Sequence, residues 1–468
     1  LRKPSEQDTV KKSESKAGKG ILRFLMSLRS INATYTLREG TFLPGFMPRP
    51  FLFGLDSSFN APGASFILGS QDPSIRYELA EKGLLTSNPN LTAPFTQTRT
   101  VDYNLRADLE PFKDLRVQLN VKKTKSTSYE EIFRQDSITN EFVSLSPTRS
   151  GGYSISFLTI ATAFSRDDED NNSAIFDNFE QNRFDVLAKF REETGVEYDT
   201  NSQDIIIPAF IAAYTGKSVN DVGLSPFPRT PLPNWRVDYT GLTKIPALKD
   251  IFQSISLTHG YNSNYNVLNY TNANEYQNGL GLENDIESYN DSFYGVQNGL
   301  NVPTYVISQV MISEQFAPLI GVNVRTNDRV TAKVEYKKQR DLALNISNAQ
   351  ITEVKSNDLV VEVGFTKANF KLPFKSQGRV ITLKNDLTFR MNFTIRDTET
   401  IQRRINELST VTNGSLNIQI RPNIIYVLNE KLNLQFYFER NINEPSISTS
   451  PRRATTRAGF QVRFSLAQ

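Results

Sequence analysis

The stretch Arg379–Arg396, RVITLKNDLTFRMNFTIR, decides the fold of this chain. Every second residue from Ile381 to Ile395 is apolar except Asn385, and all the residues between them are polar. Successive side chains point to opposite faces of a β-strand, so the pattern predicts one strand with an apolar and a polar face. A strand of about 17 residues, tilted near 45°, rises roughly 40 Å and exceeds the apolar band of an outer membrane, about 25 Å.

The same alternation recurs through most of the chain and predicts about 14 strands. The apolar rows are Val101–Leu105, Leu115–Val121, Ile255–Leu257, Ile320–Val324, Val330–Tyr336, Leu359–Phe365, Leu416–Leu428, Leu432–Phe438 and Phe460–Leu466. Each row has polar residues between its apolar positions, which predicts that every strand has one apolar and one polar face.

The connections between these predicted strands alternate in length. One set is short, at 109–114, 147–152, 326–328 and 429–431, with 242–250 and 367–378 somewhat longer. The other set is long, at 38–98, 165–232, 271–302, 348–357, 397–410 and 441–456, with 133–138 as the exception. Short periplasmic turns and long extracellular loops are typical of outer-membrane barrels, so the pattern predicts an all-β, antiparallel transmembrane barrel, or part of a larger one.

Composition excludes several other classes of protein. The 468 residues carry 53 Lys+Arg against 50 Asp+Glu, so bulk charge gives no support for nucleic-acid binding. The chain has no cysteine and one histidine, which excludes disulfides and His-pair zinc sites and argues against an enzyme. An antiparallel sandwich also alternates, but its strands are shorter and its loops do not sort by length. No fixed repeat favours a solenoid.

The rows divide the chain into consecutive segments. Residues 1–20 form a charged terminal segment without the apolar stretch of a secretory signal, 21–37 a strand, and 38–98 a capping or lumenal insertion with a short helix after Asp72-Pro73. Residues 99–164 form strands, 165–232 a partly helical extracellular cap or partner-docking insertion, and 233–468 the remaining strands. Within 165–232 we expect one helix from Ser173 to Gly195 and another from Pro208 to Gly216. Their apolar faces must be covered, either in a cap over the barrel or by a docked partner.

Candidate sites are few, and we expect no catalytic, cofactor or metal residues. The acidic run 167–170 lacks the spacing of a calcium loop, and Gly279–Gly281 lacks the context of a phosphate loop. His259 alternates with apolar neighbours and reads as a wall residue. The polar row Lys384, Asp386, Arg390 and Arg396 mixes both signs, which indicates a hydrated interior. Trp235, Tyr239, Tyr426, Phe436 and Phe438 are either interfacial girdle residues or ordinary strand residues.

Two segments resemble a known family. They are Tyr214–Leu242, YTGKSVNDVGLSPFPRTPLPNWRVDYTGL, and Ser58–Leu85, SFNAPGASFILGSQDPSIRYELAEKGLL; the ending FQVRFSLAQ is similar to a barrel's final strand. Together they resemble the SprA/Sov family, the giant translocon barrels of type IX secretion and gliding motility in the outer membrane of Bacteroidota. Members of that family are several times longer, so the resemblance implies a C-terminal portion.

The resemblance implies a pore that exports folded cargo proteins bearing C-terminal secretion signals. It implies four other partners: a PorV-type shuttle barrel at a lateral opening, a periplasmic plug protein, the remainder of the same polypeptide, and outer-membrane lipid. It carries over no catalytic residue. The alternatives are a self-contained barrel for small solutes or lipids, a TonB-dependent receptor, and a surface adhesin. A charged lumen counts against the first, and the lack of a plug domain in the first 20 residues counts against the second.

Overall fold

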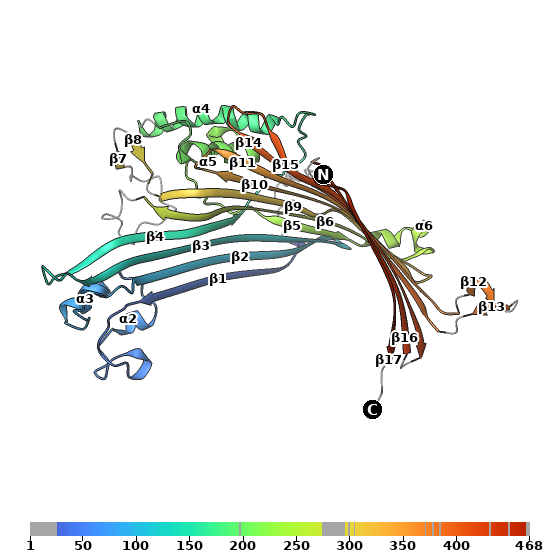
Figure 1. Cartoon of the computed structure of the whole chain (residues 1–468), viewed down its shortest axis with the longest axis horizontal. Helices are drawn as coiled ribbons and strands as arrows, with labels where there is room; N and C mark the ends of the chain where they lie inside the picture. Colours follow the sequence, from blue (N-terminus) through green and yellow to red (C-terminus); the bar gives the residue numbers. More distant parts are fainter. Residues whose placement is uncertain are drawn as a thin grey trace, which may run out of the picture.

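The computed structural model describes residues 26–195, 198–273, 295–297, 300–303, 305–369, 371–376, 379–382, 385–429, 432–447 and 450–464. One antiparallel sheet of 13 strands dominates it, in the order β1-β2-β3-β4-β6-β9-β10-β11-β14-β15-β16-β17, with β5 between β3 and β6 (Figure 1). The sheet strands are β1 (Leu28–Phe42), β2 (Phe95–Phe112), β3 (Leu115–Gln135), β4 (Phe142–Ser156), β5 (Asn234–Tyr239), β6 (Phe252–Asn272), β9 (Tyr305–Thr326), β10 (Val330–Asn345), β11 (Gln350–Lys367), β14 (Leu387–Arg404), β15 (Thr410–Asn429), β16 (Leu432–Pro445) and β17 (Arg453–Phe464).

Most of these strands join their sequence neighbours, so the chain meanders across the sheet. Two small hairpins stand apart from it: β7 (Gly295–Gln297) with β8 (Leu300–Val302), and β12 (Lys371–Ser376) with β13 (Arg379–Thr382). Among the described residues, β1 pairs only with β2 and β17 only with β16. The all-β, antiparallel prediction is confirmed, and the sheet has two open edges.

The strand predicted at Arg379–Arg396 is wrong in its bounds. Its first four residues belong to β13, and the sheet strand β14 runs from Leu387 to Arg404. Alternation continues through both pieces, so the sequence pattern does not show the break. The loops predicted at 348–357, 397–410 and 441–456 are shorter than expected, because the polar residues at their ends belong to strands. The actual connections are 346–349, 405–409 and 446–452.

The predicted turn at 147–152 is also wrong, because β4 runs straight through it and reduces the strand count. Gly151 and Gly152 are interior strand residues. A Cβ atom at Gly151 would collide with the Ser126 carbonyl oxygen and the Tyr270 hydroxyl of the neighbouring strands. This glycine therefore permits a close approach inside the sheet and does not mark a reversal of the chain.

Gly151→Ala should lower the free energy of unfolding by about 1–3 kcal/mol, because the added methyl group forces the backbone of β3 aside. Gly152→Ala is the matched control, since its Cβ would meet Leu268 O and Ser126 Oγ at 3.4 Å. Urea titration of both variants measures the difference. Equal stability of the two variants would contradict the assignment of Gly151 to a closely packed position.

Strands β4 and β5 occupy the same position in the sheet, each pairing with a different part of β3. β4 pairs with Lys123–Gln135 of β3, and β5 pairs with Leu115–Asn120 of the same strand. Between them the chain leaves the sheet at 157–233, and Leu232 N–H donates to Ser156 O (2.9 Å) at the neck. This segment is called the helical insertion below. It begins directly after β4, earlier than the predicted 165.

The helical insertion forms two layers over the sheet (Figure 1). Its helices are α4 (Ala174–Thr194) and α5 (Gln203–Thr215). Helix α4 confirms the predicted cap residues, with Ser173 extended before it and Gly195 left-handed after it. Helix α5 begins five residues before the predicted Pro208. All its residues are buried, and this burial offsets the backbone hydrogen bond that an internal proline removes.

Helix α5 packs on the sheet itself, which identifies the surface that its apolar side chains require. It shares one core with residues of β4, β6, β9, β10 and β11. These sheet residues are Tyr153, Ile155, Tyr265, Val267, Tyr270, Ile307, Val310, Ile312, Leu342, Leu344 and Ile351. Helix α4 lies outside α5 and buries Phe176, Phe179, Val186 and Phe190. The helical insertion is thus a two-layer cover on one face of the sheet.

A second cover lies on β2 and β3 and comes from residues 43–94. It contains η1 (Leu52–Gly54), α2 (Ala64–Ile67) and α3 (Ile75–Glu81), the last as predicted after Asp72-Pro73. Leu79 and Leu85 pack with Phe95, Tyr129 and Phe133 of the sheet. Arg76 of α3 forms a buried ion pair with Glu131 and lies over the rings of Tyr77 and Phe95. Two short 3-10 segments, η2 (Val219–Asp221) and η3 (Gly241–Lys244), and α6 (Pro246–Lys249) complete the helices described.

Candidate functional site

The register of the sheet aligns the apolar rows into one continuous surface, called the apolar belt. Phe389 pairs with Phe365 on one side and with Ile424 on the other, and Phe436 pairs with Ile424 and Phe460. The belt residues are Ile31, Ala33, Tyr35, Leu37, Val101, Tyr103, Leu105, Val117, Leu119, Val121, Trp235, Val237, Tyr239, Ile255, Leu257, Ile320, Val322, Val324, Val330, Ala332, Val334, Tyr336, Leu359, Val361, Val363, Phe365, Phe389, Met391, Phe393, Ile395, Ile418, Ile420, Ile424, Tyr426, Leu434, Phe436, Phe438, Phe460, Val462 and Phe464. It crosses the sheet from one open edge to the other.

Most of the apolar belt is half-exposed or exposed, and only Val101 and Ile255 of the belt residues named above are buried. Ile31, Ile320 and Phe460 keep 56, 63 and 62% of their surface accessible. In the described part of the chain no second sheet covers the belt, as a sandwich would require. A soluble protein rarely exposes a contiguous apolar patch larger than a few hundred Å². The belt therefore needs an apolar environment.

The opposite face, called the polar face, carries charges that pair across and along strands. Its ion pairs include Arg396–Asp358 (2.7 Å), Arg421–Glu439 (2.8 Å), Arg236–Asp238 (2.9 Å), Lys333–Glu335 (3.0 Å) and Arg38–Asp102 (3.0 Å). Each is at least partly exposed to water, so its contribution to stability is small, about 0–1 kcal/mol. These pairs keep the polar face hydrated.

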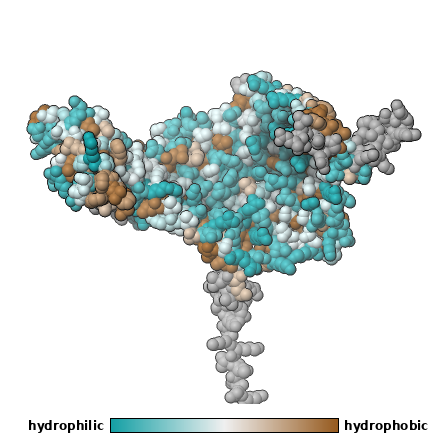
Figure 2. Space-filling view, turned by 90° about the horizontal axis from the view of Figure 1, so that it is seen from below, coloured by the Kyte–Doolittle hydropathy of each residue, from teal (hydrophilic) through white to brown (hydrophobic). Residues whose placement is uncertain are grey.

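A hollow of about 940 Å³ lies on the polar face, over strands β6 to β15. Its lining combines neutral polar groups such as Asn323 with one carboxylate, Glu362, and five basic side chains: Arg325, Arg329, Lys333, Arg390 and Arg421. From below the orientation of Figure 1 the molecule shows mainly hydrophilic residues, with hydrophobic residues gathered in separate patches (Figure 2). The hollow has the polarity of a water-filled passage.

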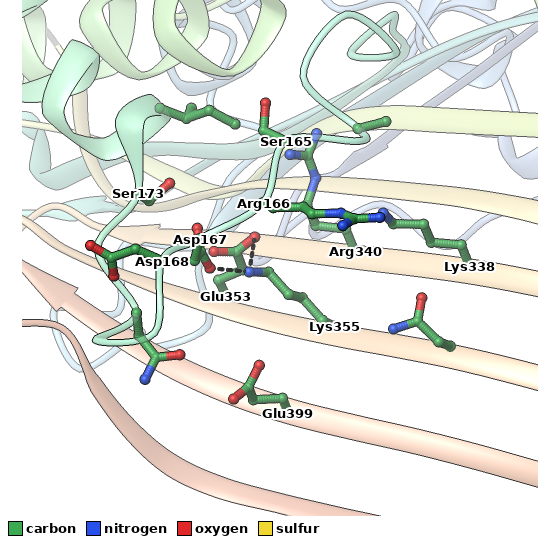
Figure 3. A pocket seen from close by; sticks show the side chains of 14 residues that line it. Ser165, Arg166, Asp167, Asp168, Ser173, Lys338, Arg340, Glu353, Lys355 and Glu399 are labelled. Carbon is green, nitrogen blue, oxygen red and sulfur yellow. Dashed lines mark hydrogen bonds and ion pairs between the residues drawn. The ribbon is translucent and has the colours of Figure 1, made fainter.

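A second pocket, of about 320 Å³, lies where the helical insertion meets β10, β11 and β14 (Figure 3). Asp167 of the insertion forms ion pairs with Arg403 (2.7 Å) and Lys355, and Glu353 forms ion pairs with the same two cations. The Arg403 side chain is completely buried. It also donates to the backbone oxygen of Asn171, so it fixes the insertion to β14.

A neighbouring buried pair extends this anchor to β9 and β10. Arg340 pairs with Glu314 (2.8 Å), and both side chains are almost inaccessible. Arg340 also donates to Thr162 O and Thr162 Oγ1, each at 3.0 Å. Glu314 accepts from Thr159 Oγ1 (2.6 Å) and Tyr261 O–H (2.8 Å). Satisfied hydrogen bonds of this kind are what make a buried charge tolerable.

The acidic run 167–170 has structural partners. Asp167 is one member of the ion-pair cluster, and the side chain and backbone of Asn172 donate to Asp168 and lower the pKa of that carboxyl. In the described part of the chain, no group of three or more His, Asp or Glu side chains could hold a metal ion. The run therefore acts in this structure as an ordered, charged loop.

The other predicted site residues lie in several places. His259 is on the belt face of β6, with Nδ1 2.7 Å from Leu319 O. Arg390 and Arg396 lie on the polar face, as expected for the mixed-sign row. The Lys384 side chain and Gly279–Gly281 lie outside the described residues, as do residues 1–20 and the final Leu466. Among the described residues, Arg390 lines the hollow on the polar face, and His259 and Arg396 do not.

All five candidate girdle residues lie on the same face of the sheet as the apolar belt. Trp235 stacks on Tyr261 with ring centroids 4.5 Å apart, and Tyr239 meets Phe112 edge to face at 6.2 Å. Tyr426 pairs with Leu434, Phe436 is 42% exposed, and Phe438 pairs with Ala458. Trp235 lies toward the helical insertion and Tyr239 toward the opposite end of β5, so aromatic rings occur at both margins of the belt.

The buried ion-pair cluster was not identified from the sequence. Glu314, Arg340, Glu353 and Arg403 stand at positions with the same parity as the belt, where an apolar residue is the rule. The signal available in the sequence was the presence of charged residues at positions where the alternation predicts apolar ones. They indicate where the belt ends and a packed, polar interface begins.

No helix in the described residues has both the length and the hydropathy needed to cross a bilayer. No protein-family model matches the chain, and no curated protein is similar to it in sequence.

Proposed function

We propose that this chain is a wall segment of an outer-membrane β-barrel that exports folded proteins carrying C-terminal secretion signals, as in type IX secretion. The observation that carries the proposal is the apolar belt, which crosses the sheet from edge to edge and is largely accessible. Lipid tails are the apolar environment that such a belt requires. The polar face then looks into a water-filled lumen.

The two open edges of the sheet support the proposal that the barrel wall continues with further strands. β1 and β17 each expose a row of unpaired backbone N–H and C=O groups along one edge in the described residues. Within a bilayer every such group must be paired, so spanning strands form closed barrels. Further strands of the same translocon polypeptide would provide that closure.

The polar face supports transport of large, hydrated cargo over transport of small apolar molecules. Its hollow is lined mainly by charged and polar side chains, with more cations than carboxylates. A hydrated lining of charged and polar groups does not remove water from the surface of a folded protein. The resemblance noted from the sequence supplies the cargo class and the other partners, a PorV-type shuttle barrel and a periplasmic plug.

The helical insertion has a defined side in this proposal. It covers strand residues that share parity with the belt, so it lies on the outer side of the wall, beyond the bilayer surface. That position differs from a plug inside the lumen. It suits a docking surface for a second membrane protein alongside the barrel, such as the shuttle.

The single tryptophan provides a direct test of the membrane position. Trp235 has belt parity and lies at the belt margin, so bromine atoms near the headgroups of brominated lipids should quench its fluorescence more than deep bromines do. In the control, Trp235→Phe combined with Gln118→Trp moves the probe to the polar face, where lipid bromines should have little effect. Absence of quenching at Trp235 would overturn the membrane proposal.

Site-specific photocrosslinking tests the export proposal. A photoreactive amino acid at Arg390, in the polar hollow, should capture a defined cargo protein with a C-terminal secretion domain in actively secreting cells. The same group at the adjacent belt residue Phe389 should not. Export is contradicted if the cargo crosslinks equally at both positions or at neither while secretion continues.

A further inference from the structure

A row of rings leads across three strands to a lysine at the margin of the belt. Trp235 pairs with Tyr261, Tyr261 with Phe316, and Phe316 with Lys338. Phe164 of the helical insertion lies against Phe316 at 5.2 Å and remains 51% exposed. Tyr261 and Phe316 are buried, so Trp235 and Phe164 are the accessible rings of this row. Tryptophan is enriched at the level of lipid headgroups.

The position of Lys338 along β10 is consistent with the level of the lipid headgroups. It comes directly after the belt residues Val330 to Tyr336 on the same face. Eight residues at about 3.4 Å each, in a strand tilted by about 40°, place it roughly 20 Å above the turn at 327–329. That height is near the far edge of the apolar band, about 25 Å tall.

Lys338 and Arg166 are the cations of this margin that have no carboxylate partner among the described residues. Lys338 Nζ lies 5.0 Å from the ring centroid of Phe164, and both cations line the charged pocket (Figure 3). Of the nearby carboxylates, Asp167 and Glu353 pair with Arg403 and Lys355, and Glu314 pairs with Arg340. Asp168 accepts from Asn172, and Glu399 lies on β14, two strands away from Lys338. The margin therefore has positive charge available beside exposed apolar surface.

We infer that this margin binds a membrane lipid with a phosphate headgroup. The phosphate contacts Lys338 and Arg166, and the acyl chains lie on the belt below, over Ile320 and Tyr336, which are 63% and 39% exposed. The inference rests on the proposed membrane position. Charge complementarity selects an anionic headgroup, and the continuous apolar surface below selects a lipid over a soluble phosphate compound.

Native mass spectrometry of the purified protein can measure lipid retention. Lipid A and dephosphorylated lipid A have the same acyl chains and differ in their phosphates, so they separate the headgroup contribution from that of the tails. We expect roughly tenfold better retention of lipid A, about the effect of one charge-assisted contact. The Lys338→Gln/Arg166→Gln double variant should lose that preference, and Lys333→Gln on the polar face of the same strand should keep it.

Three results would overturn the inference: equal retention of both lipids, an unchanged preference in the double variant, or displacement of bound lipid A by millimolar inorganic phosphate alone. The last result would identify a phosphate site and not a lipid site. Quenching of Trp235 fluorescence distinguishes failure of the lipid-site inference from failure of the membrane proposal. Quenched Trp235 without a lipid A preference contradicts only the lipid site, whereas unquenched Trp235 contradicts the membrane proposal on which it rests.

Discussion

Arg403→Met is expected to release the helical insertion from the sheet, at a cost of about 3–5 kcal/mol in folding free energy. The Arg403 side chain is fully buried and pairs with Glu353 and Asp167, which are only 5% and 12% exposed. Methionine fills similar space but leaves both carboxylates with Lys355 as their remaining cation. Hydrogen exchange of α4 and α5, together with urea titration, measures the loss.

The adjacent residue provides the control. Arg404 pairs with Glu407, and both side chains are more than half exposed, so Arg404→Met should cost less than about 1 kcal/mol. Adding Glu353→Leu to Arg403→Met should recover part of the stability, because one uncompensated buried charge is removed. Equal protection of α4 and α5 in the two single variants would show that the ion-pair cluster does not hold the insertion.

Phe393→Arg is expected to impair assembly by about 2–4 kcal/mol, since in the proposed barrel it places a charge on the lipid side of the wall near mid-membrane depth. Phe393 pairs with Val361 and Ile420, so apolar residues flank it on both neighbouring strands. The retained folded fraction on unheated gels and urea titration in vesicles measure the effect. The size of the loss should fall as the substitution is moved toward either margin of the belt.

Asn392→Arg is the matched control on the polar face. Asn392 lies beside Glu362, its amide donating at 3.4 Å, and lines the hydrated hollow. A charge there stays in water near a carboxylate, so the folding free energy should change by no more than about 0.5 kcal/mol. If both substitutions are tolerated, the assignment of the two faces is incorrect.

The sequence predicted those features that depend on local periodicity. Alternation predicted antiparallel strands with two unlike faces, and the rows around Val361 and Phe389 lie on one face as expected. The residues Ser173 and Gly195 predicted both ends of α4, because cap residues act within one helical turn. The polar placement of Arg390 and Arg396 followed from the same parity.

The errors arose where a local signal has two meanings. Gly151-Gly152 is typical of a turn, but here it permits neighbouring strands to approach closely. Polar residues such as those at 397–404 are typical of a loop, but here they extend β14. Pro208 is typical of a first helical turn, but the burial of Ile205–Ile207 places it inside α5.

Periodicity by itself therefore determined the all-β character, the two faces and the belt residues, because the pleat of a strand fixes the side of each side chain. Only the tertiary structure decided which rows are neighbours, where β4 gives way to β5, and that Arg340, Glu353 and Arg403 meet the helical insertion. Those contacts join residues far apart in the chain, such as Asp167 and Arg403, and their partners are set by strand register, which a single strand's pattern does not specify.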